Sequence, residues 1–537
     1  MKSLVQDYLE ELFDFQPVWA LASGRLEAAA KTVDLSESRI RRHLEALKII
    51  SQKLRRVRSP KQGSEARLEW ELLRSDLKLR EREWKRSRKY RLDPSMYVGE
   101  LTYGLWYLLL RVESPKLKVE AALARMNDAE RLLQDARRNL KRPPRLWTQL
   151  AIEETDGLLT FLVDVRGELL RLAPKRAAEI RSAYARARAT AEGFRAFYRG
   201  PLLRSSTGRF AVGRKEYDFL LKNYHHYNID SKRLRKIGEE QFELARLALV
   251  EQAKRIDPRK SWPALIEEAK RRHPSADRLL AVYRRETKAL RTFVGRRKIA
   301  SLPRGERLRV IETPAFTRNT IPFAAYVDPP MFGGKNHGTF FVTPVTAKGK
   351  KREELLGEHS YGALRVTALH EGYPGHHLQF AVQKQAPGTM MKIYNCSSFF
   401  EGWALYCEEL MHEAGYYDEW GRLLQLKDKL WRACRILVDV GLQTGTMSDA
   451  KAVRFMAKEL KMSPASARAD VNWYTMRPTV PQSYLTGMLR LRELREKCRR
   501  KWGRRFSFQR FHDAVLRYGA IPIPLLEKVL LSKGLAS

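Results

Sequence analysis

Three imidazoles and two carboxylates lie close together around a proline–glycine pair in one part of this sequence. The segment HEGYPGHH contributes His370, Glu371, His376 and His377 within eight positions, in a chain that has 11 histidines. Glu401 follows in the segment FEGWALYCE, on the next expected helix. Neutral imidazole is a common zinc ligand, and a carboxylate beside the metal can act as a general base toward water. The pattern predicts a zinc hydrolase site, although a Pro-Gly turn between two helices would also account for part of it.

The spacing of these histidines differs from the common H-E-x-x-H motif, whose two ligands lie on one helix face. On a straight helix His376 would lie about 9 Å beyond His370 and about 240° around the axis, on the wrong face. His377 would return to the right face, but about 10.5 Å along it. Pro374 clashes with the carbonyl of His370, and Gly375 permits unusual backbone angles. We therefore predict a bulge that returns His376 to the metal, with His377 as the alternative ligand or a supporting residue.

Composition places the chain among ordinary globular proteins. At 537 residues it can bury a large core, and no window approaches the ~20 apolar residues needed to span a membrane. Its four cysteines are widely spaced and form no C-x-x-C pair, and the first residues include acids and no apolar run. These features predict a cytoplasmic protein with reduced thiols, no membrane span and no secretory signal.

The formal net charge of +40 is the second conspicuous feature. A surface so positive would attract nucleic acid, anionic lipid or acidic peptides. The basic residues are spread along the whole chain, however, and the densest run, Arg80 to Arg91, also contains Glu81 and Glu83. Such a run is typical of a solvated helix face, and no recognisable nucleic-acid-binding module accompanies it. Nucleic acid is therefore a possible partner but not the favoured one.

Most of the sequence repeats apolar residues every three or four positions, which predicts helices. We expect helices at Leu4–Phe13, Ser36–Val57, Lys118–Leu140, Ala173–Phe197, Ser231–Ile256 and Ala276–Val294, and again from Glu353 to the end. Between them, short strands are expected at Leu308–Ile311, Phe323–Val327 and Gly338–Pro344, forming a small sheet. A peptide could pair with the last strand as an additional strand, or the sheet could only cover the core. The residues expected to contact such a peptide are His337, Gly338, Thr339, Phe340 and Tyr373.

The sequence resembles a bacterial family, domain-of-unknown-function family 885, whose members carry H-E-x-Y-P-G-H-H-L-Q and E-G-W-A-L-Y-x-E. Both motifs are intact here, at His370–Gln379 and Glu401–Glu408, and weaker matches cover nearly the whole chain. The resemblance implies a mostly α-helical peptidase related to the gluzincins, with two helical lobes around a deep cleft and a small β-sheet beside the metal-binding helix. We expect a helical N-terminal lobe, 1–305, and a metal-binding catalytic lobe, 306–537, packed as one unit. One departure is PTVP at Pro478–Pro481, where family members often have P-G-Q-A.

On these grounds we expect His370, His376 and Glu401 to hold Zn²⁺ and leave a position open for water. Glu371 would take the proton of that water as it attacks a peptide carbonyl, and would then pass it to the leaving amine. The expected oxyanion donor is one of three residues, Tyr484, Tyr474 or Arg477. Glu408, seven residues after Glu401 on nearly the same helix face, could support a ligand histidine. The expected substrate is a short peptide.

Two other interpretations remain open. The same site could serve a zinc amidase that does not cleave peptides. Alternatively, the chain could be a basic protein that binds nucleic acid or an anionic surface, with a secondary metal site. The intact Glu371 favours an active hydrolase over the second alternative.

Overall fold

The N-terminal part of the protein is helical throughout. A computed structural model describes residues 1–314, 318, 321 and 323–532. Several helices begin where a side chain accepts a hydrogen bond from the first turn, as Ser36 does from Arg39 and Ser64 from Arg67. The helices of this part are α1 (Lys2–Phe15), α2 (Pro17–Ala22), α3 (Glu37–Arg56), α4 (Glu65–Arg82), α5 (Ser95–Arg111), α6 (Pro115–Asn127), α7 (Ala129–Asn139), α8 (Arg145–Leu172), α9 (Ala177–Phe197), α10 (Leu203–Ser205) and α11 (Arg214–Asn223).

Three more helices lead to a small sheet. They are α12 (Ser231–Ile256), α13 (Trp262–Lys270) and α14 (Leu279–Arg296). The strands are β1 (Arg307–Glu312), β2 (Ala324–Val327) and β3 (His337–Val342), in the spatial order β1-β3-β2. β3 pairs with β1 in parallel and with β2 in antiparallel orientation. The prediction of three short strands in this region is confirmed.

Helices return after the sheet and continue to the C-terminal end of the described chain. They are α15 (Gly349–Gly357), α16 (Tyr361–Glu371), α17 (His376–Gln383), α18 (Thr389–Ile393), α19 (Ser397–Glu413), α20 (Glu419–Gln443), α21 (Asp449–Leu460), α22 (Pro464–Met476), α23 (Ser483–Trp502), α24 (Phe508–Leu516) and α25 (Ile523–Ser532). The predicted fold class, mostly α with a small sheet, is confirmed. Among the described helices, none combines the length and the apolar character that a membrane span requires.

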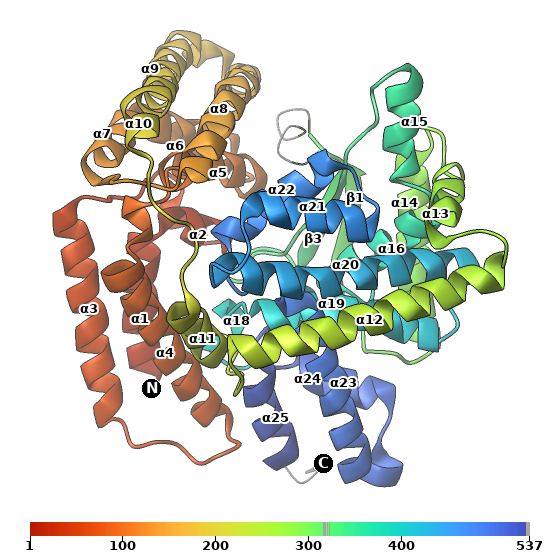
Figure 1. Ribbon diagram of the computed structural model, residues 1–537. Coiled ribbons are helices and arrows are strands. Elements are labelled where there is room, and N and C mark those ends of the chain that lie inside the picture. Colours follow the sequence, from red (N-terminus) through yellow and green to blue (C-terminus); the bar gives the residue numbers. More distant parts are fainter. Residues whose placement is uncertain (315–317, 319–320, 322, 533–537) are drawn as a thin grey trace.

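Figure 1 shows α1–α11 on one side of the molecule and the sheet with α13–α16 on the other. The long α12 runs across the front along α20, and α19 lies behind it between the two sides. The C-terminal helices α23–α25 extend below α19. The helix with Glu401 is thus enclosed by elements from distant parts of the sequence.

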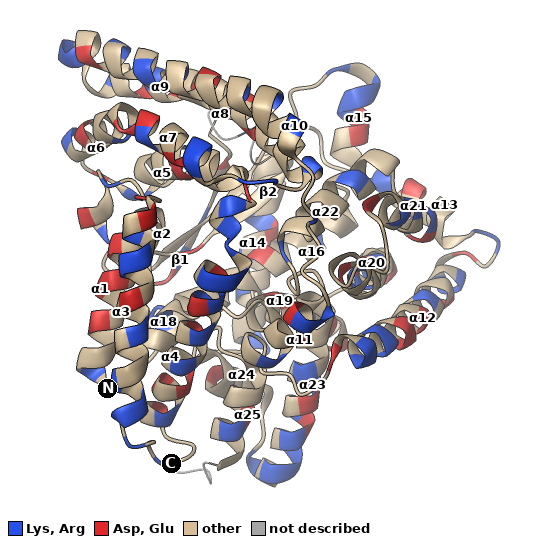
Figure 2. Ribbon diagram, turned by 60° about the vertical axis from the view of Figure 1, so that its left-hand side comes forward, with Lys and Arg blue, Asp and Glu red and all other residues tan. Residues whose placement is uncertain are grey.

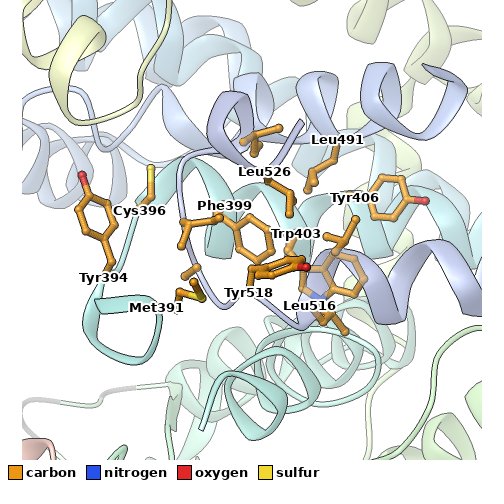
Figure 3. Packing of buried hydrophobic residues seen from close by; sticks show 14 of the residues in the cluster. Met391, Tyr394, Cys396, Phe399, Trp403, Tyr406, Leu491, Leu516, Tyr518 and Leu526 are labelled. Carbon is orange, nitrogen blue, oxygen red and sulfur yellow. The ribbon is translucent and has the colours of Figure 1, made fainter. Parts of the chain in front are cut away.

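The largest hydrophobic core contains residues from both sides of position 305, from Leu4 to Leu530. Its centre is α19: Figure 3 shows Phe399 and Trp403 packed with Leu516 and Tyr518. A second core lies entirely within the N-terminal helices, from Phe15 to Leu202. The shared core agrees with the expectation that the two parts pack as one unit, while the division at residue 305 stays a prediction.

Helix boundaries differ from the expected ones in one instructive place. The segment Lys118–Leu140 was expected to form one helix, but α6 ends at Asn127 and α7 begins at Ala129. Asp128 between them accepts hydrogen bonds from Thr32 and Arg131, both of which lie outside α6. The pattern that is continuous in the sequence is thus interrupted at a residue that makes a tertiary contact with Thr32.

Charged side chains are distributed over most helices. Figure 2 shows Lys and Arg on nearly every element in view, with Asp and Glu interspersed among them. Many form ion pairs one turn apart on the same helix, such as Arg235 with Glu239 and Arg188 with Glu192. The excess positive charge is thus distributed over the elements in this view and is not confined to one of them.

Candidate metal centre

The side chains of His370, His376 and Glu401 converge between α16, α17 and α19. Nε2 of His376 lies 3.4 Å from Oε2 of Glu401, and Nε2 of His370 lies 3.8 Å from the same oxygen. One donor atom from each residue lies within 4.8 Å of the others. In a tetrahedral zinc site with bonds of about 2.1 Å, neighbouring donors are about 3.4 Å apart. Two imidazole nitrogens and a carboxylate oxygen at these distances fit a zinc ion with a fourth position left open.

The chain reverses sharply between His370 and His376. The helix is broken rather than bulged, because α16 ends at Glu371 and α17 begins at His376. A Cβ on Gly375 would lie 2.0 Å from the carbonyl oxygen of His370, so only glycine fits this close approach. The indole of Trp403 donates a hydrogen bond to the Pro374 carbonyl at 2.9 Å and ties the turn to α19. The two imidazole centroids are 4.7 Å apart as a result.

Glu408 fixes the orientation of His370. Nδ1 of His370 donates a hydrogen bond to Oε1 of the fully buried Glu408 at 2.8 Å, which turns Nε2 toward Glu401. Burial lowers the pKa of His370, but the hydrogen bonds with Glu401 and Glu408 outweigh burial and raise it to about 10. Before a metal binds, this imidazole is therefore held as a cation between two carboxylates.

Glu401 has a third neighbour in Tyr484, whose hydroxyl donates a hydrogen bond to Oε1 at 2.8 Å. Burial would raise the pKa of Glu401, but His370 and His376 outweigh it and hold the pKa far below its usual range. The guanidinium of Arg435 lies over the Tyr484 ring at 4.6 Å. Glu401 is thus ionised and has one oxygen directed to the imidazoles and the other held by Tyr484.

Glu371 lies beside the cluster with its carboxylate available. The structure gives this side chain no hydrogen-bond partner among the residues it describes, and the residue is half-buried. Its charge contributes to the raised pKa of His370 and also raises the pKa values of Tyr283 and Tyr326, after burial as the larger cause. A free carboxylate at this position can accept a proton from a molecule bound next to the imidazoles.

The other two expected oxyanion donors lie apart from Glu401. Tyr474 is fully buried, donates a hydrogen bond to Asp470 at 3.0 Å and accepts one from Arg435 at 2.9 Å. Arg477 lines a cavity of about 610 Å³ between α4, α8, α11 and the α22–α23 connection. Of the three expected donors, only Tyr484 contacts a residue of the cluster.

The connection before Tyr484 contains the departure from the family pattern. Thr479 has a φ of 66°, in the left-handed region that glycine adopts readily and β-branched residues rarely do. Here the Thr479 N–H lies 3.4 Å from Oδ1 of Asp439, and burial raises the pKa of Asp439 to about 7.

His377 points away from the cluster. Its Nε2 donates a hydrogen bond to Oε2 of Glu306 at 2.8 Å, and its Nδ1 lies 3.2 Å from the Tyr326 hydroxyl. The Glu306 side chain is completely buried and also accepts hydrogen bonds from Tyr373 at 2.6 Å and Arg291 at 3.0 Å. The sequence interpretation missed Glu306 and Tyr326. No local pattern marks either residue, because Glu306 lies just before β1 and Tyr326 lies within β2, both far from His377 in the sequence.

The prediction that a peptide could pair with Gly338–Pro344 is wrong. β3 is the central strand: β1 pairs with it along its whole length, and β2 occupies the other side from Thr339 to Val342. The sequence pattern identified the strand but carried no information on the order of strands in space. Among the described strands, β1 and β2 are the edges of the sheet. β2 lies next to the metal cluster, because the ring of its Tyr326 is 6.4 Å from the ring of His376.

The residues expected to contact substrate around β3 have other partners. Thr339 accepts a hydrogen bond from Arg309 at 3.1 Å, Phe340 packs edge-on against Tyr283, and Tyr373 donates to Glu306. All three are buried, which does not fit direct contact with a substrate. A Cβ on Gly338 would lie 2.5 Å from Nδ1 of His377, so this glycine makes room for the imidazole. His337, at the start of β3, is half-buried.

Comparisons with known proteins place this geometry in context. The model of a bacterial family of unknown function, DUF885, matches residues 17–530. Two solved structures share the fold. One is described as a putative lipoprotein of unknown function from Shewanella oneidensis, with 20% identity, 98% of this chain and 99% of that chain covered, and a TM-score of 0.79. The other is described as a putative lipoprotein from Colwellia psychrerythraea. It is 18% identical, the match covers 99% of this chain and 98% of that chain, and the TM-score is 0.81. No curated protein matches the chain.

Proposed function

The chain belongs to the bacterial family DUF885, and from its site we propose that it is a zinc-dependent hydrolase that cleaves peptide bonds in short peptides. The observation that carries the proposal is the convergence of two imidazole nitrogens and one carboxylate oxygen within 4.8 Å, next to Glu371, whose carboxylate has no hydrogen-bond partner in the part of the chain that the structure describes. This donor set and its spacing suit zinc with one open position.

Each residue of the site has a distinct part in the proposed reaction. A zinc ion held by His370, His376 and Glu401 would supply Lewis acidity toward a water molecule and a substrate carbonyl. Glu371 takes the proton of the attacking water and returns it to the leaving amine. Glu408 holds His370 in the required orientation through Nδ1.

Tyr484 is the favoured oxyanion donor, because its hydroxyl is already at Glu401 and can turn from Oε1 toward a charge that develops beside the cluster. Tyr474 and Arg477 are set aside for this part, since Tyr474 is engaged with Asp470 and Arg435 and Arg477 lines a separate cavity. The side chain of Arg435 supports the Tyr484 ring from behind.

The peptide substrate itself is supported by the position of the sheet. β2 has one side paired with β3, and its Tyr326 lies at the metal cluster. An extended peptide could pair with the other side of β2 and place a peptide bond near the cluster. A zinc amidase would use the same three donors, and a panel of small amides tested beside short peptides separates the two activities.

The metal assignment is tested by zinc analysis of purified protein and three single variants. We expect one zinc per chain in the wild type and its loss in His370→Ala and in His376→Ala. His377→Ala is the matched control, because this neighbouring imidazole points to Glu306 and should leave the zinc in place. Full zinc occupancy in His376→Ala, or zinc loss only in His377→Ala, would reject the proposed ligand set.

We propose a cytoplasmic location on the basis of the cysteine pattern. Both solved relatives are described as putative lipoproteins, so this point needs its own measurement. Fractionation of cells that express the native sequence should find the protein in the soluble cytoplasmic fraction. Recovery with the membrane fraction would contradict the proposal.

A further inference from the structure

A buried arginine beside the metal cluster has hydrogen-bond donors that the protein does not use. Arg435 of α20 is only 8% exposed, and its Nε donates a hydrogen bond to the Tyr474 hydroxyl at 2.9 Å. In the part of the chain that the structure describes, neither of its Nη nitrogens has a hydrogen-bond partner, and neither is sealed from solvent. A guanidinium is a donor at all three nitrogens and accepts nothing, so the donors on the two Nη nitrogens remain for another molecule.

Aromatic rings fix the position of this guanidinium next to the cluster. Its Cζ lies 4.6 Å from the centroid of the Trp431 ring and 4.6 Å from that of the Tyr484 ring. Tyr484 in turn donates a hydrogen bond to the proposed zinc ligand Glu401 at 2.8 Å. The guanidinium is therefore one tyrosine side chain away from the cluster. Contacts with the rings hold its charge without hydrogen bonds from the Nη nitrogens.

The acidic groups near Arg435 are occupied by other partners. Asp470 accepts hydrogen bonds from Nε1 of Trp431 at 2.8 Å and from the Tyr474 hydroxyl at 3.0 Å. The two oxygens of Glu401 face the imidazoles and Tyr484. Burial lowers the pKa of Arg435, but the nearby tyrosines and carboxylates outweigh burial and raise it, so the group stays a cation.

The neighbouring cations of α20 differ from Arg435 in one respect. Arg432 and Lys427 also lie over the Trp431 ring, at 4.9 Å and 5.7 Å. Both form an ion pair with Asp428, at 3.4 Å and 3.7 Å. Arg435 has no such pair among the residues that the structure describes, and it is the one of these three cations that contacts Tyr484. Its charge is thus available to an anion at the cluster.

We infer that Arg435 forms a subsite for the free C-terminal carboxylate of a peptide substrate. This inference rests on the proposed peptidase function and names the end of the substrate that the same site recognises. A planar guanidinium binds the two oxygens of a carboxylate through two parallel N–H bonds, and the Nη nitrogens of Arg435 provide these donors. Because the group is deeply set, the end of a chain reaches it more readily than the middle of a backbone. One residue of extended chain spans about 3.3–3.6 Å, so the subsite favours cleavage near the carboxyl end.

The experiment compares the binding of three short peptides by calorimetry. The first is N-acetyl-tetra-alanine, whose carboxylate is free, and the second is its amide, in which both ends are blocked. The third is the same blocked peptide with glutamate as its last residue, which carries its carboxylate on a side chain. Since the first and third peptides have the same charge, their comparison separates a terminal carboxylate from an acidic side chain and from general attraction to the positive surface.

The protein is the full-length, zinc-loaded Glu371→Gln variant, so that a bound peptide is not turned over. We expect the peptide with the free carboxylate to bind about tenfold more tightly than the doubly blocked one, as a hydrogen bond to a charged group commonly allows. The glutamate peptide should bind within a few-fold of the doubly blocked one.

Further variants in the same background assign this preference to Arg435. Arg435→Gln should reduce the ratio of the two affinities to near one. Arg435→Lys, which keeps the charge but not the planar pair of donors, should retain only part of the preference. Arg432→Gln is the matched control, because this arginine of the same helix is paired with Asp428 and its loss should leave the ratio unchanged. Zinc content should stay at one per chain in all three variants.

Several results would overturn the inference. Equal binding of the free and blocked peptides, or a preference that survives Arg435→Gln, would reject the carboxylate subsite and leave the proposed peptidase function standing. Tight binding of the glutamate peptide would assign recognition to an acidic side chain or to the surface charge. An equal loss of affinity for all three peptides in Arg435→Gln would show that Arg435 only supports Tyr484. Failure of every peptide to bind would reject both the subsite and the peptide substrate class.

Discussion

The state of a single imidazole connects the geometry of the site with its expected response to pH. His370 lies between Glu401 and Glu408, which together raise its pKa to about 10 against the opposing effect of burial. The imidazole is therefore protonated at neutral pH, with a proton in the place that zinc would take on Nε2. Zinc binding must displace that proton, so metal and proton compete for one nitrogen.

Zinc affinity should accordingly fall as the pH falls. Below the raised pKa of His370, each unit of pH should weaken zinc binding about tenfold, and each zinc bound should release about one proton. Calorimetry in buffers of different ionisation enthalpy measures the released proton directly, between about pH 6 and 8. An affinity independent of pH across this range would contradict the placement of His370 between two carboxylates.

Two tyrosines from the same expected set should behave differently when the hydroxyl is removed. Tyr484→Phe removes the donor at Glu401, and we expect kcat to fall by about 10² with zinc retained. Tyr474→Phe is the matched control, because among the described residues its hydroxyl bonds to Asp470 and Arg435 and not to the cluster. It should lower the free energy of unfolding by about 1 kcal/mol and leave kcat within a few-fold of the wild type. Equal losses of kcat in the two variants would remove Tyr484 from the oxyanion role.

The sequence predicted which residues of the site would meet, but not how they are supported. The spacing around Pro374 and Gly375 placed His376 rather than His377 beside His370, and that is where the structure has it. Glu306 and Tyr326 could not be found in this way, because each is about 50 or more residues distant from His377 in sequence and neither belongs to a local pattern. Contacts of this kind are set by tertiary packing.

At the level of elements, the site depends on how closely two helices cross. α19 carries Glu401 and α23 carries Tyr484, and they meet at two glycines. A Cβ on Gly487 would lie 1.9 Å from the Ser398 carbonyl oxygen, and one on Gly402 would lie 2.5 Å from Cα of Gly487. These neighbours are backbone atoms, which cannot move aside as a flexible side chain can.

Gly487→Ala should therefore separate α19 from α23. We expect it to lower the free energy of unfolding by about 2–3 kcal/mol through overpacking and to reduce activity by moving Tyr484 away from Glu401. Gly157→Ala in α8 is the matched control, since a Cβ there meets no atom within 4 Å and the change should stabilise the protein by about 0.5–1 kcal/mol. Urea denaturation measures both, and a neutral Gly487→Ala would refute the close crossing.

The elements themselves were largely predictable, whereas their order in space was not. Ser231–Ile256 was expected from apolar periodicity and is the observed span of α12. The strand at β3 was also expected, but its position between β1 and β2 depends on crossovers that periodicity does not encode. The predicted pairing of substrate with β3 failed for this reason.

For the whole molecule, we propose that the metal cluster opens into a cleft between the N-terminal helices and the sheet. Tyr103 of α5 is 49% exposed, and Asp328, just after β2, has 37% of its side chain exposed. The contact of Arg111 with Asp328 at 3.5 Å joins α5 to the end of β2.

A cleft enclosed by two lobes should admit extended peptides and exclude folded proteins. We expect a series of short peptides to be cleaved, with little cleavage of a stable globular protein under the same conditions. The positive surface should speed the association of acidic peptides, and added salt should remove that advantage. Comparable cleavage rates for the peptides and the folded protein would reject the enclosed site and favour an open groove.

The central claim is that Glu371 acts as the base of a zinc-dependent peptidase, and one comparison tests it most directly. The comparison measures how fast a short peptide is hydrolysed by the zinc-loaded wild-type protein and by the zinc-loaded Glu371→Gln variant. The glutamine keeps the shape of the side chain but cannot take the proton. We predict that the variant retains one zinc per chain and loses activity by a factor of about 10²–10⁴. A variant with its zinc and near wild-type turnover, or a wild type that cleaves no peptide when loaded with zinc, would contradict the account.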